Sequence, residues 1–366
     1  MEFNSTSSFE GDLNATTEPE PCYQEYVIET TELKVQAALR SAVGLFSFVC
    51  CASVVIVIVL FKKYKFYAQR LILYLSIVTM VHAFSYVLTR VNYYTPRPID
   101  DPYCYFSGAL NHYTAANGVL SVWCITLNLL TKTLCNRSTV KAEPIFIAVI
   151  FFLPASWIWV PIWFKAYGTA GAWCSIRSLD DDCTPFKNRT WFRFGLWYIP
   201  LYILMFVIVI SMILAAIRIS RSSRKWVGKW DPEVAIMQQT LKREILSLIW
   251  YPLIYLLLNT FSLIAQIYDA VNPMNPSAVL IYLRIVTSPL RGAFIALAFG
   301  LDRETRGRLR PAQCRAACLE WLPGRRDTEI EDFVMSNTSF QESYVPYEAM
   351  SEEDNVIWNA HQQKSD

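Results

Sequence analysis

The chain has 366 residues, of which 54% are hydrophobic and only 17% are charged, and its formal net charge is +2. The apolar share is higher and the charged share lower than in ordinary soluble domains, so an integral membrane protein is the expected class. The near-neutral charge gives no reason to expect a nucleic-acid polymer as a partner.

The N-terminal segment, residues 1–39, is polar and acidic. It lacks the basic start and the short apolar stretch of a cleavable signal peptide, so we expect the first apolar helix to direct the chain to the membrane. Asn4 and Asn14 lie in N-x-S/T triplets, which are glycosylation acceptors on the outer side of a membrane. We therefore predict a glycosylated extracellular tail.

Seven apolar segments follow, each long enough to cross a bilayer core about 30 Å thick, which needs about 20 helical residues. Six contain no Asp, Glu, Lys or Arg, whereas the seventh contains Arg284 and Arg291. The expected spans are about 41–61, 71–89, 104–131, 144–164, 194–217, 245–268 and 275–301. The sequence thus predicts an all-α membrane protein, with a seven-transmembrane helix bundle over residues 40–301.

Lysine and arginine set the expected orientation of this bundle. If the N-terminus lies outside, the cytoplasmic segments carry more than twice as many of these residues as the outer segments. We therefore place the N-terminus outside and the C-terminus in the cytoplasm, as in a multi-pass protein of the plasma membrane. Asn188 then becomes a third outer glycosylation site.

The ten cysteines divide according to this topology. Cys22, Cys104, Cys174 and Cys183 lie outside, and an even number in an oxidising compartment favours disulfides. Three connectivities are possible, and we favour Cys104 with Cys174, and Cys22 with Cys183. The first bridge would hold the long second outer loop over the mouth of the bundle, or serve stability alone.

Residues 302–322 are expected to form an interfacial helix along the inner leaflet, in which Pro311 either breaks or starts a helix. Cys314 and Cys318 share one face of such a helix and are candidates for palmitoylation. The segment 323–366 is acidic and rich in Ser and Thr, as expected of a disordered cytoplasmic tail that phosphorylation would charge further.

Other classes of membrane protein fit less well. A retinal protein would need a lysine in the last span, which has none. A membrane hydrolase would need clustered metal ligands, and the clean spans contain no carboxylate, so we expect neither an enzyme nor a cofactor. A transporter or channel and an orphan seven-helix scaffold remain as alternatives to a receptor.

Several residues in the spans are candidates for ligand binding or for a conformational switch. A charge within the membrane must face the interior or reach an interface. Arg284 could therefore meet a ligand, and Arg291 could bond Asn128, Asn259 or backbone carbonyls. The ligand-pocket candidates are His112, Asn117, Tyr198 and Arg284. The switch candidates are Pro252, Asn259, Pro289 and Arg291, because proline bends helices and can provide a pivot. On the inner side, Lys242 and Arg243 form a basic rim at the start of the sixth span.

Four motifs carry a family resemblance: Trp173-Cys174 in the second outer loop, RFGLWYIPLYI entering the fifth span, KREILSLIWYPLIY in the sixth and TSPLRGAFIALAFG in the seventh. In this order they resemble the slime-mould cyclic-AMP-receptor type of G-protein-coupled receptor and its animal relatives, with secretin-class features. The resemblance covers about residues 40–300. The chain departs from it where the pattern PLQG reads Pro289-Leu290-Arg291-Gly292, and no DRY-type triplet follows the third span, so rhodopsin-class switch logic cannot be transferred.

The resemblance implies an extracellular small-molecule ligand, of which cyclic AMP is the type example. It also implies a heterotrimeric G protein as the cytoplasmic partner, which Lys242 and Arg243 would face. Arrestin would then engage the phosphorylated tail.

Overall fold

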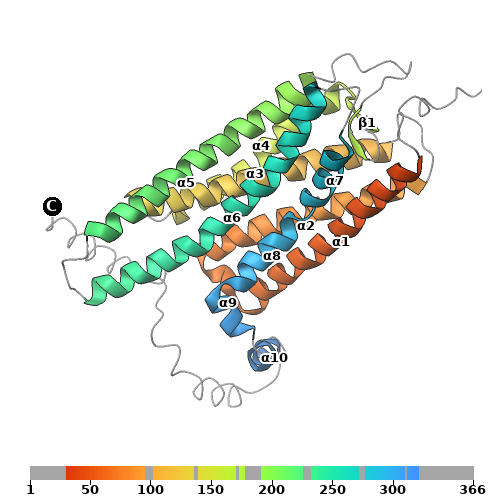
Figure 1. The fold of residues 1–366 in the computed structure, drawn as a ribbon. Helices are drawn as coiled ribbons and strands as arrows, with labels where there is room; N and C mark the ends of the chain where they lie inside the picture. Colours follow the sequence, from red (N-terminus) through yellow and green to blue (C-terminus); the bar gives the residue numbers. More distant parts are fainter. Residues whose placement is uncertain are drawn as a thin grey trace, which may run out of the picture.

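The structure, a computed structural model, describes residues 30–94, 102–135, 139–169, 173–177, 191–225, 232–271, 277–309 and 311–320. Long helices run side by side along the bundle (Figure 1). They are α1 (Thr30–Leu60), α2 (Tyr67–Tyr94), α3 (Pro102–Cys135), α4 (Glu143–Trp163), α5 (Ile199–Lys225) and α6 (Pro232–Val271). Short 3₁₀ turns, η1 (Lys63–Lys65) and η2 (Val140–Ala142), precede α2 and α4, and a π-helix, η3 (Trp191–Tyr198), leads into α5.

The last span consists of two helices, α7 (Ala278–Thr287) and α8 (Arg291–Leu301), which are bent by 46° at the break between them. Pro289 lies in this break, as expected of a residue that lacks a backbone N–H. Counted as one span, the pair joins six other helices of the described chain that are long and apolar enough to cross a membrane. The predicted seven-span fold is therefore confirmed, and the chain is a multi-pass membrane protein.

The helix after the last span differs from the prediction. Residues 302–322 do not form one helix, because α9 (Arg303–Arg308) ends before α10 (Pro311–Glu320) begins. Asp302 caps α9 by accepting a hydrogen bond from the Thr305 backbone N–H at 3.2 Å. Pro311 begins α10, where its missing N–H costs no helical hydrogen bond.

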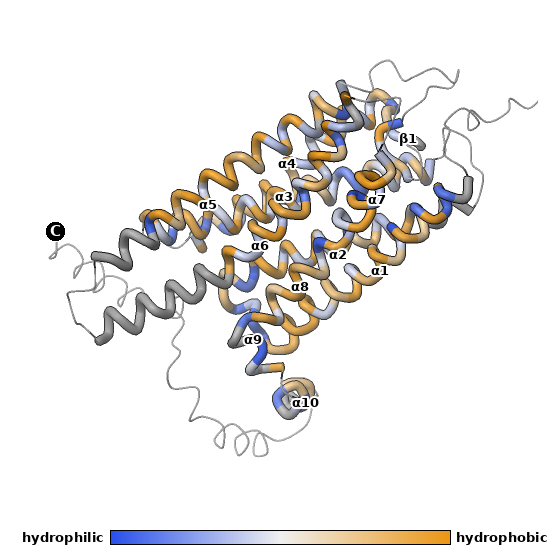
Figure 2. Tube along the Cα trace, in the orientation of Figure 1, coloured by the Kyte–Doolittle hydropathy of each residue, from blue (hydrophilic) through white to orange (hydrophobic). Residues whose placement is uncertain are grey.

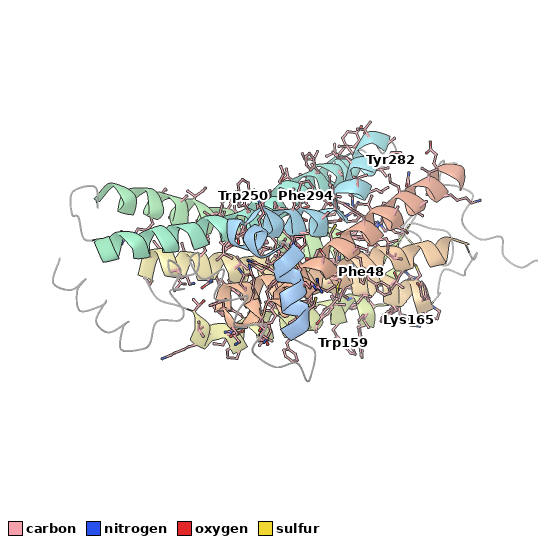
Figure 3. All side chains as sticks on the ribbon, turned by 90° about the horizontal axis from the view of Figure 1, so that it is seen from below. Phe48, Trp159, Lys165, Trp250, Tyr282 and Phe294 are labelled. Carbon is pink, nitrogen blue, oxygen red and sulfur yellow. A yellow bond between two sulfur atoms is a disulfide. The ribbon has the colours of Figure 1, made fainter. Side chains whose placement is uncertain are left out.

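The bundle exposes many large apolar side chains on its outside and buries polar side chains among those of its apolar core, as expected in lipid. Trp159, Trp163 and Trp250 are 58%, 72% and 58% exposed. Trp159 and Trp250 are labelled in Figure 3, and hydrophobic residues predominate along most of the helices (Figure 2). In contrast, Asn117 and Asn128 on α3 are almost completely buried. α3 is the most enclosed span, so its polar groups must find partners within the protein.

Gly292 allows α8 to pack closely against α1. A Cβ atom at this position would overlap Ser47 Oγ and lie 3.0 Å from the Ser47 carbonyl oxygen. The absence of a side chain therefore lets the two backbones approach, as small residues do between helices in membranes. Arg291, the residue before it, is thereby carried into the bundle.

Polar contacts join the helices at the end of the bundle where α9 lies. Arg70 on α2 and Glu143 at the start of α4 form a bidentate ion pair, with both N···O distances 2.7 Å, and the Tyr74 hydroxyl donates to the same carboxylate at 2.8 Å. The buried Lys63 ammonium donates to Thr305 Oγ1 at 2.9 Å. The η1 turn and α9 are thus held together.

Candidate functional site

A pocket of about 750 Å³, including its opening to solvent, lies beneath a short β-hairpin. Its described lining comes from α1, α2, α3, α5 with η3, α6, α7 and α8, and from the hairpin. Six of the seven spans therefore contribute, and α4 does not.

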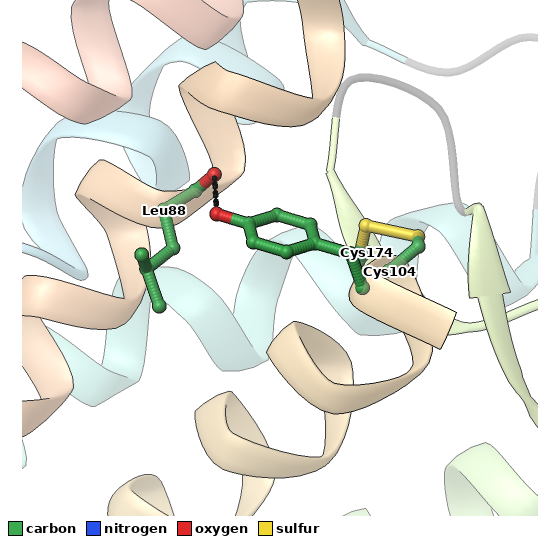
Figure 4. Close-up of a disulfide and its surroundings, with 4 residues drawn as sticks. Leu88, Cys104 and Cys174 are labelled. Carbon is green, nitrogen blue, oxygen red and sulfur yellow. Dashed lines mark hydrogen bonds between the residues drawn. A yellow bond between two sulfur atoms is a disulfide. The ribbon is translucent and has the colours of Figure 1, made fainter. Parts of the chain in front are cut away.

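The hairpin pairs β1 (Tyr167–Thr169) with β2 (Cys174–Ile176) in antiparallel register, with Thr169 opposite Cys174. A disulfide joins Cys174 to Cys104 at the start of α3 (Figure 4). Beside it, the Tyr103 hydroxyl donates to the Leu88 carbonyl of α2 at 3.0 Å (Figure 4). The hairpin is thus tied over the mouth of the bundle, as the sequence predicted for this pair of cysteines.

His112 connects α3 to the hairpin. Its Nδ1 lies 3.2 Å from the Tyr167 hydroxyl and its Nε2 lies 3.3 Å from Ser175 Oγ. Burial raises the pKa of the Tyr167 hydroxyl, so this group stays protonated. Because both ring nitrogens face hydroxyl groups of the hairpin, His112 positions the hairpin as well as lining the pocket.

Arg291 is the centre of a hydrogen-bond network at the bottom of the pocket. Its Nη1 donates to the Tyr255 hydroxyl at 3.0 Å. Its Nη2 lies 2.9 Å from His82 Nε2 and donates to the Ser288 hydroxyl at 3.0 Å and the Tyr86 hydroxyl at 3.3 Å. Its Nε donates to the Ser288 carbonyl at 2.8 Å. One guanidinium group therefore joins α2, α6 and the break between α7 and α8.

The hydrogen bonds of Arg291 determine the tautomer of His82. Arginine only donates, so His82 Nε2 must accept, and the ring proton must lie on Nδ1. That nitrogen is 2.8 Å from Thr114 Oγ1, whose own proton goes to the Leu110 carbonyl at 2.8 Å. The network thus continues from Arg291 through neutral His82 into α3.

Two further arginines line the pocket and share one aromatic partner. The Arg40 guanidinium lies 4.5 Å from the centre of the Tyr86 ring and 4.7 Å from the centre of a Trp173 ring. The Arg284 guanidinium lies 5.4 Å from Trp173, and its Nη2 donates to the Tyr198 hydroxyl at 3.4 Å. These cation–π contacts help to hold both arginines in place.

The predicted ligand-pocket residues separate into two groups. His112, Tyr198 and Arg284 all line the pocket. Asn117 does not: it is buried on α3, and its amide faces the carbonyl oxygens of Tyr113 and Ile150 at 2.8 and 3.2 Å. Asn117 therefore binds backbone near α4, away from the ligand space.

The predicted switch residues also have different surroundings. α6 continues through Pro252, and Asn259 lines the pocket while its Nδ2 donates to the Tyr255 carbonyl at 2.7 Å. Of the acceptors expected for Arg291, which were Asn128, Asn259 or backbone carbonyls, the structure shows a backbone carbonyl, that of Ser288 at 2.8 Å. Asn128 accepts from Thr139 Oγ1 at 2.8 Å.

Several predicted sites lie outside the described residues. They are the pairing of Cys22 with Cys183, and the glycosylation sites Asn4, Asn14 and Asn188. The side chains of Lys242 and Arg243 are also outside the described set, although both residues lie in α6. Cys314 and Cys318 lie on α10, and Cys318 is exposed. Palmitoylation of these two cysteines stays a prediction.

The sequence did not indicate all residues of the site. The residues that it did not indicate include three acceptors of Arg291, which are His82, Tyr86 and Tyr255. They also include Arg40 and Trp173, which line the pocket and contact each other. The spacing of His82 and Tyr86, which lie four residues apart in a span without charged residues, was the available signal. Among the residues that the structure describes, no group of three His, Cys, Asp or Glu side chains could hold a metal ion.

Comparison with known proteins gives two findings. A family model described as the C-terminal part of a G-protein-coupled glucose receptor regulating Gpa2 matches residues 236–306, which include most of α6 and all of α7 and α8. The structure of squid rhodopsin aligns with a TM-score of 0.58 and 13% sequence identity, covering 89% of this chain and 96% of the squid protein. The comparison with curated protein sequences gives no match. The structural likeness shows the seven-helix fold that the sequence predicted.

Proposed function

We propose that the chain is a G-protein-coupled receptor of the plasma membrane that transmits an extracellular small-ligand signal to heterotrimeric G proteins. The observation that carries this proposal is a polar pocket beneath a disulfide-tied hairpin. In this pocket, Arg291 bonds residues of both α2 and α6. The family model that matches α6 to α8 supports the same class. The hairpin end and the N-terminus would face outside.

The Arg291 network provides a route from the pocket to α6. Tyr255 lies one helical turn from Pro252, and its hydroxyl is the only α6 group among the described residues that Arg291 contacts through a hydrogen bond. A ligand that changes the position of Arg291 would therefore change how α6 is held. Such a ligand acts by binding more tightly to the state in which the inner part of α6 has swung outward.

The cytoplasmic end of α6 would receive the G protein. Lys242 and Arg243 lie in this part of α6 and would present a basic surface to an acidic partner. The likeness to the cyclic-AMP-receptor type makes cyclic nucleotides reasonable first test ligands. The glucose-receptor description of the family model makes glucose a second test ligand.

Dissociation of G-protein subunits, measured by energy transfer in cells that express the chain, tests this function. We expect a signal above that of mock-transfected cells in at least one G-protein subtype, and Arg284→Gln should reduce any ligand-dependent part. Glu32→Gln, at an exposed position on α1, serves as the matched control. Silence across all subtypes at confirmed surface expression would favour a transporter or a scaffold instead.

The acidic tail supports arrestin as a second cytoplasmic partner of the proposed receptor. Phosphorylation would add negative charge to its Ser and Thr residues, including Thr338 and Ser339. Truncation at Asp327 should abolish ligand-dependent arrestin recruitment and leave G-protein dissociation intact. Unchanged recruitment and internalisation of the truncated receptor would remove arrestin from the proposal.

A further inference from the structure

We propose that the pocket binds a small organic anion, whose carboxylate or phosphate group is held by Arg40 and Arg284 beside Trp173. This inference rests on the proposed receptor function and specifies the chemical class of its ligand. It follows from the charge, the hydrogen bonds and the aromatic contacts of the three arginines.

The pocket has an excess of positive charge. Arg40, Arg284 and Arg291 all line it, and no Asp or Glu occurs among its described lining residues. Charges of the same sign repel strongly where water is scarce, and a buried cation without an anion is unfavourable. The described lining of the pocket therefore carries three positive charges and no negative one, and an anionic ligand could supply the counter-charge.

The three arginines differ in how well their N–H groups are satisfied. All the contacts described for Arg291 are with neutral acceptors on three helices, so it belongs to the framework of the site. Arg40 is held by the faces of Tyr86 and Trp173. Its Nε is buried and has no hydrogen-bond partner in the part of the chain that the structure describes. Stacking on ring faces leaves the in-plane N–H donors of a guanidinium available for an anion.

Arg284 reaches the same indole from α7 and is also held by neutral groups. It donates to the Tyr198 hydroxyl, and it donates from both terminal nitrogens to the Gln266 side-chain oxygen when that amide is oriented to accept. Trp173 thus contacts both arginines, one from α1 and one from α7. An acidic group placed beside this indole could accept from both, and arginine binds carboxylate and phosphate with paired hydrogen bonds.

A neutral ligand would fit this site less well than an anion. A sugar would leave all three guanidinium charges without a counter-charge, whereas one anionic group lowers the repulsion among them. The stacked rings of Tyr198 and Tyr202, whose centres are 5.9 Å apart, offer an apolar surface for the organic part of the ligand. The inference therefore favours an organic acid or phosphate over glucose.

Replacement of Gln266 by glutamate tests the charge deficit without knowledge of the ligand. Gln266→Glu keeps the shape of the side chain and places a carboxylate against Arg284. In purified full-length receptor in phosphatidylcholine nanodiscs, we expect the apparent melting temperature to rise by about 2–4 °C, the shift typical of a stabilisation of one kcal/mol. Asn117→Asp is the matched control, because it buries a carboxylate outside the pocket, and it should lower the melting temperature.

Inorganic phosphate then tests anion binding directly. In the same discs, phosphate should raise the melting temperature of the wild type more than that of Arg284→Gln. A rise that requires phosphatidic acid in the discs, with no effect of soluble phosphate, would assign the same anion site to a lipid headgroup. A fall in melting temperature with Gln266→Glu, or equal responses of wild type and Arg284→Gln to both phosphate and phosphatidic acid, would overturn the proposal. Neither readout involves a G protein, so failure of coupling and failure of anion binding remain distinguishable.

Discussion

Replacement of Arg291 by alanine should destabilise the protein more than any other single substitution of a charged residue in the spans. The substitution removes donors from the Tyr255, Tyr86 and Ser288 hydroxyls and from His82. The Tyr255 hydroxyl would lose its partner among the described residues, whereas His82, Tyr86 and Ser288 would keep the bonds among themselves. Hydrogen bonds to a charged group contribute about 1.5–3 kcal/mol each, so losing two or more of them should cost about 3–5 kcal/mol. The apparent melting temperature of the purified protein should fall by about 10 °C, at about 2–4 °C for each kcal/mol.

Two variants make this test specific. Arg306 on α9 is exposed, and its side chain donates to the Leu301 carbonyl at 3.2 Å, so Arg306→Ala should leave the melting temperature nearly unchanged. Arg291→Lys keeps the charge but cannot reach acceptors on three helices at once, so it should be intermediate. Equal melting temperatures for Arg291→Ala and Arg306→Ala would show that the network does not stabilise the bundle.

Loss of the disulfide between Cys104 and Cys174 is the second large expected effect. The two cysteines are 70 residues apart, and closing a loop of this length stabilises a folded protein by about 4 kcal/mol in the chain-entropy description. Cys174→Ser also releases Trp173, its neighbour, from Arg40 and Arg284. We expect a severe loss of surface expression, measured with an antibody that does not cross the membrane, and a lower melting temperature for the fraction that folds.

The free cysteine Cys50 offers a matched control, because Cys50→Ser removes a thiol without breaking a covalent bond. The double variant with serine at both positions 104 and 174 should be no worse than either single variant, since one bond is lost in each case. If the two single effects added in the double variant, they would have to arise from local packing and not from the bond.

Most of the fold could be predicted from the sequence, because the bilayer imposes a simple physical requirement. Backbone groups in lipid must be satisfied within a helix, so each apolar stretch of sufficient length indicates a span. The bend in the last span was also foreseeable, since Pro289 cannot donate a helical hydrogen bond. The hairpin was not, because its strands have three residues each and carry no periodic pattern.

The candidate site could be predicted only in part. A charge such as Arg291 must face the interior, so its importance was visible in the sequence. Its partners were not visible, because the rotation of one helix relative to its neighbours decides which polar side chains meet. Asn128 was an equally reasonable acceptor by composition. However, it lies about two and a half helical turns from Val119, the last described α3 residue that lines the pocket, and it bonds Thr139.

The arginines of the last span also affect how the protein is assembled in the membrane. An arginine near the centre of a helix raises the free energy of membrane insertion by about 2.5–3.5 kcal/mol. The last span contains Arg284 and Arg291, so it should insert poorly without help from other helices. The acceptors His82 and Tyr86 precede Arg291 in the chain by 209 and 205 residues. During synthesis α2 is therefore made long before the last span emerges, and it can offer a polar surface that receives Arg291 as that span leaves the translocon.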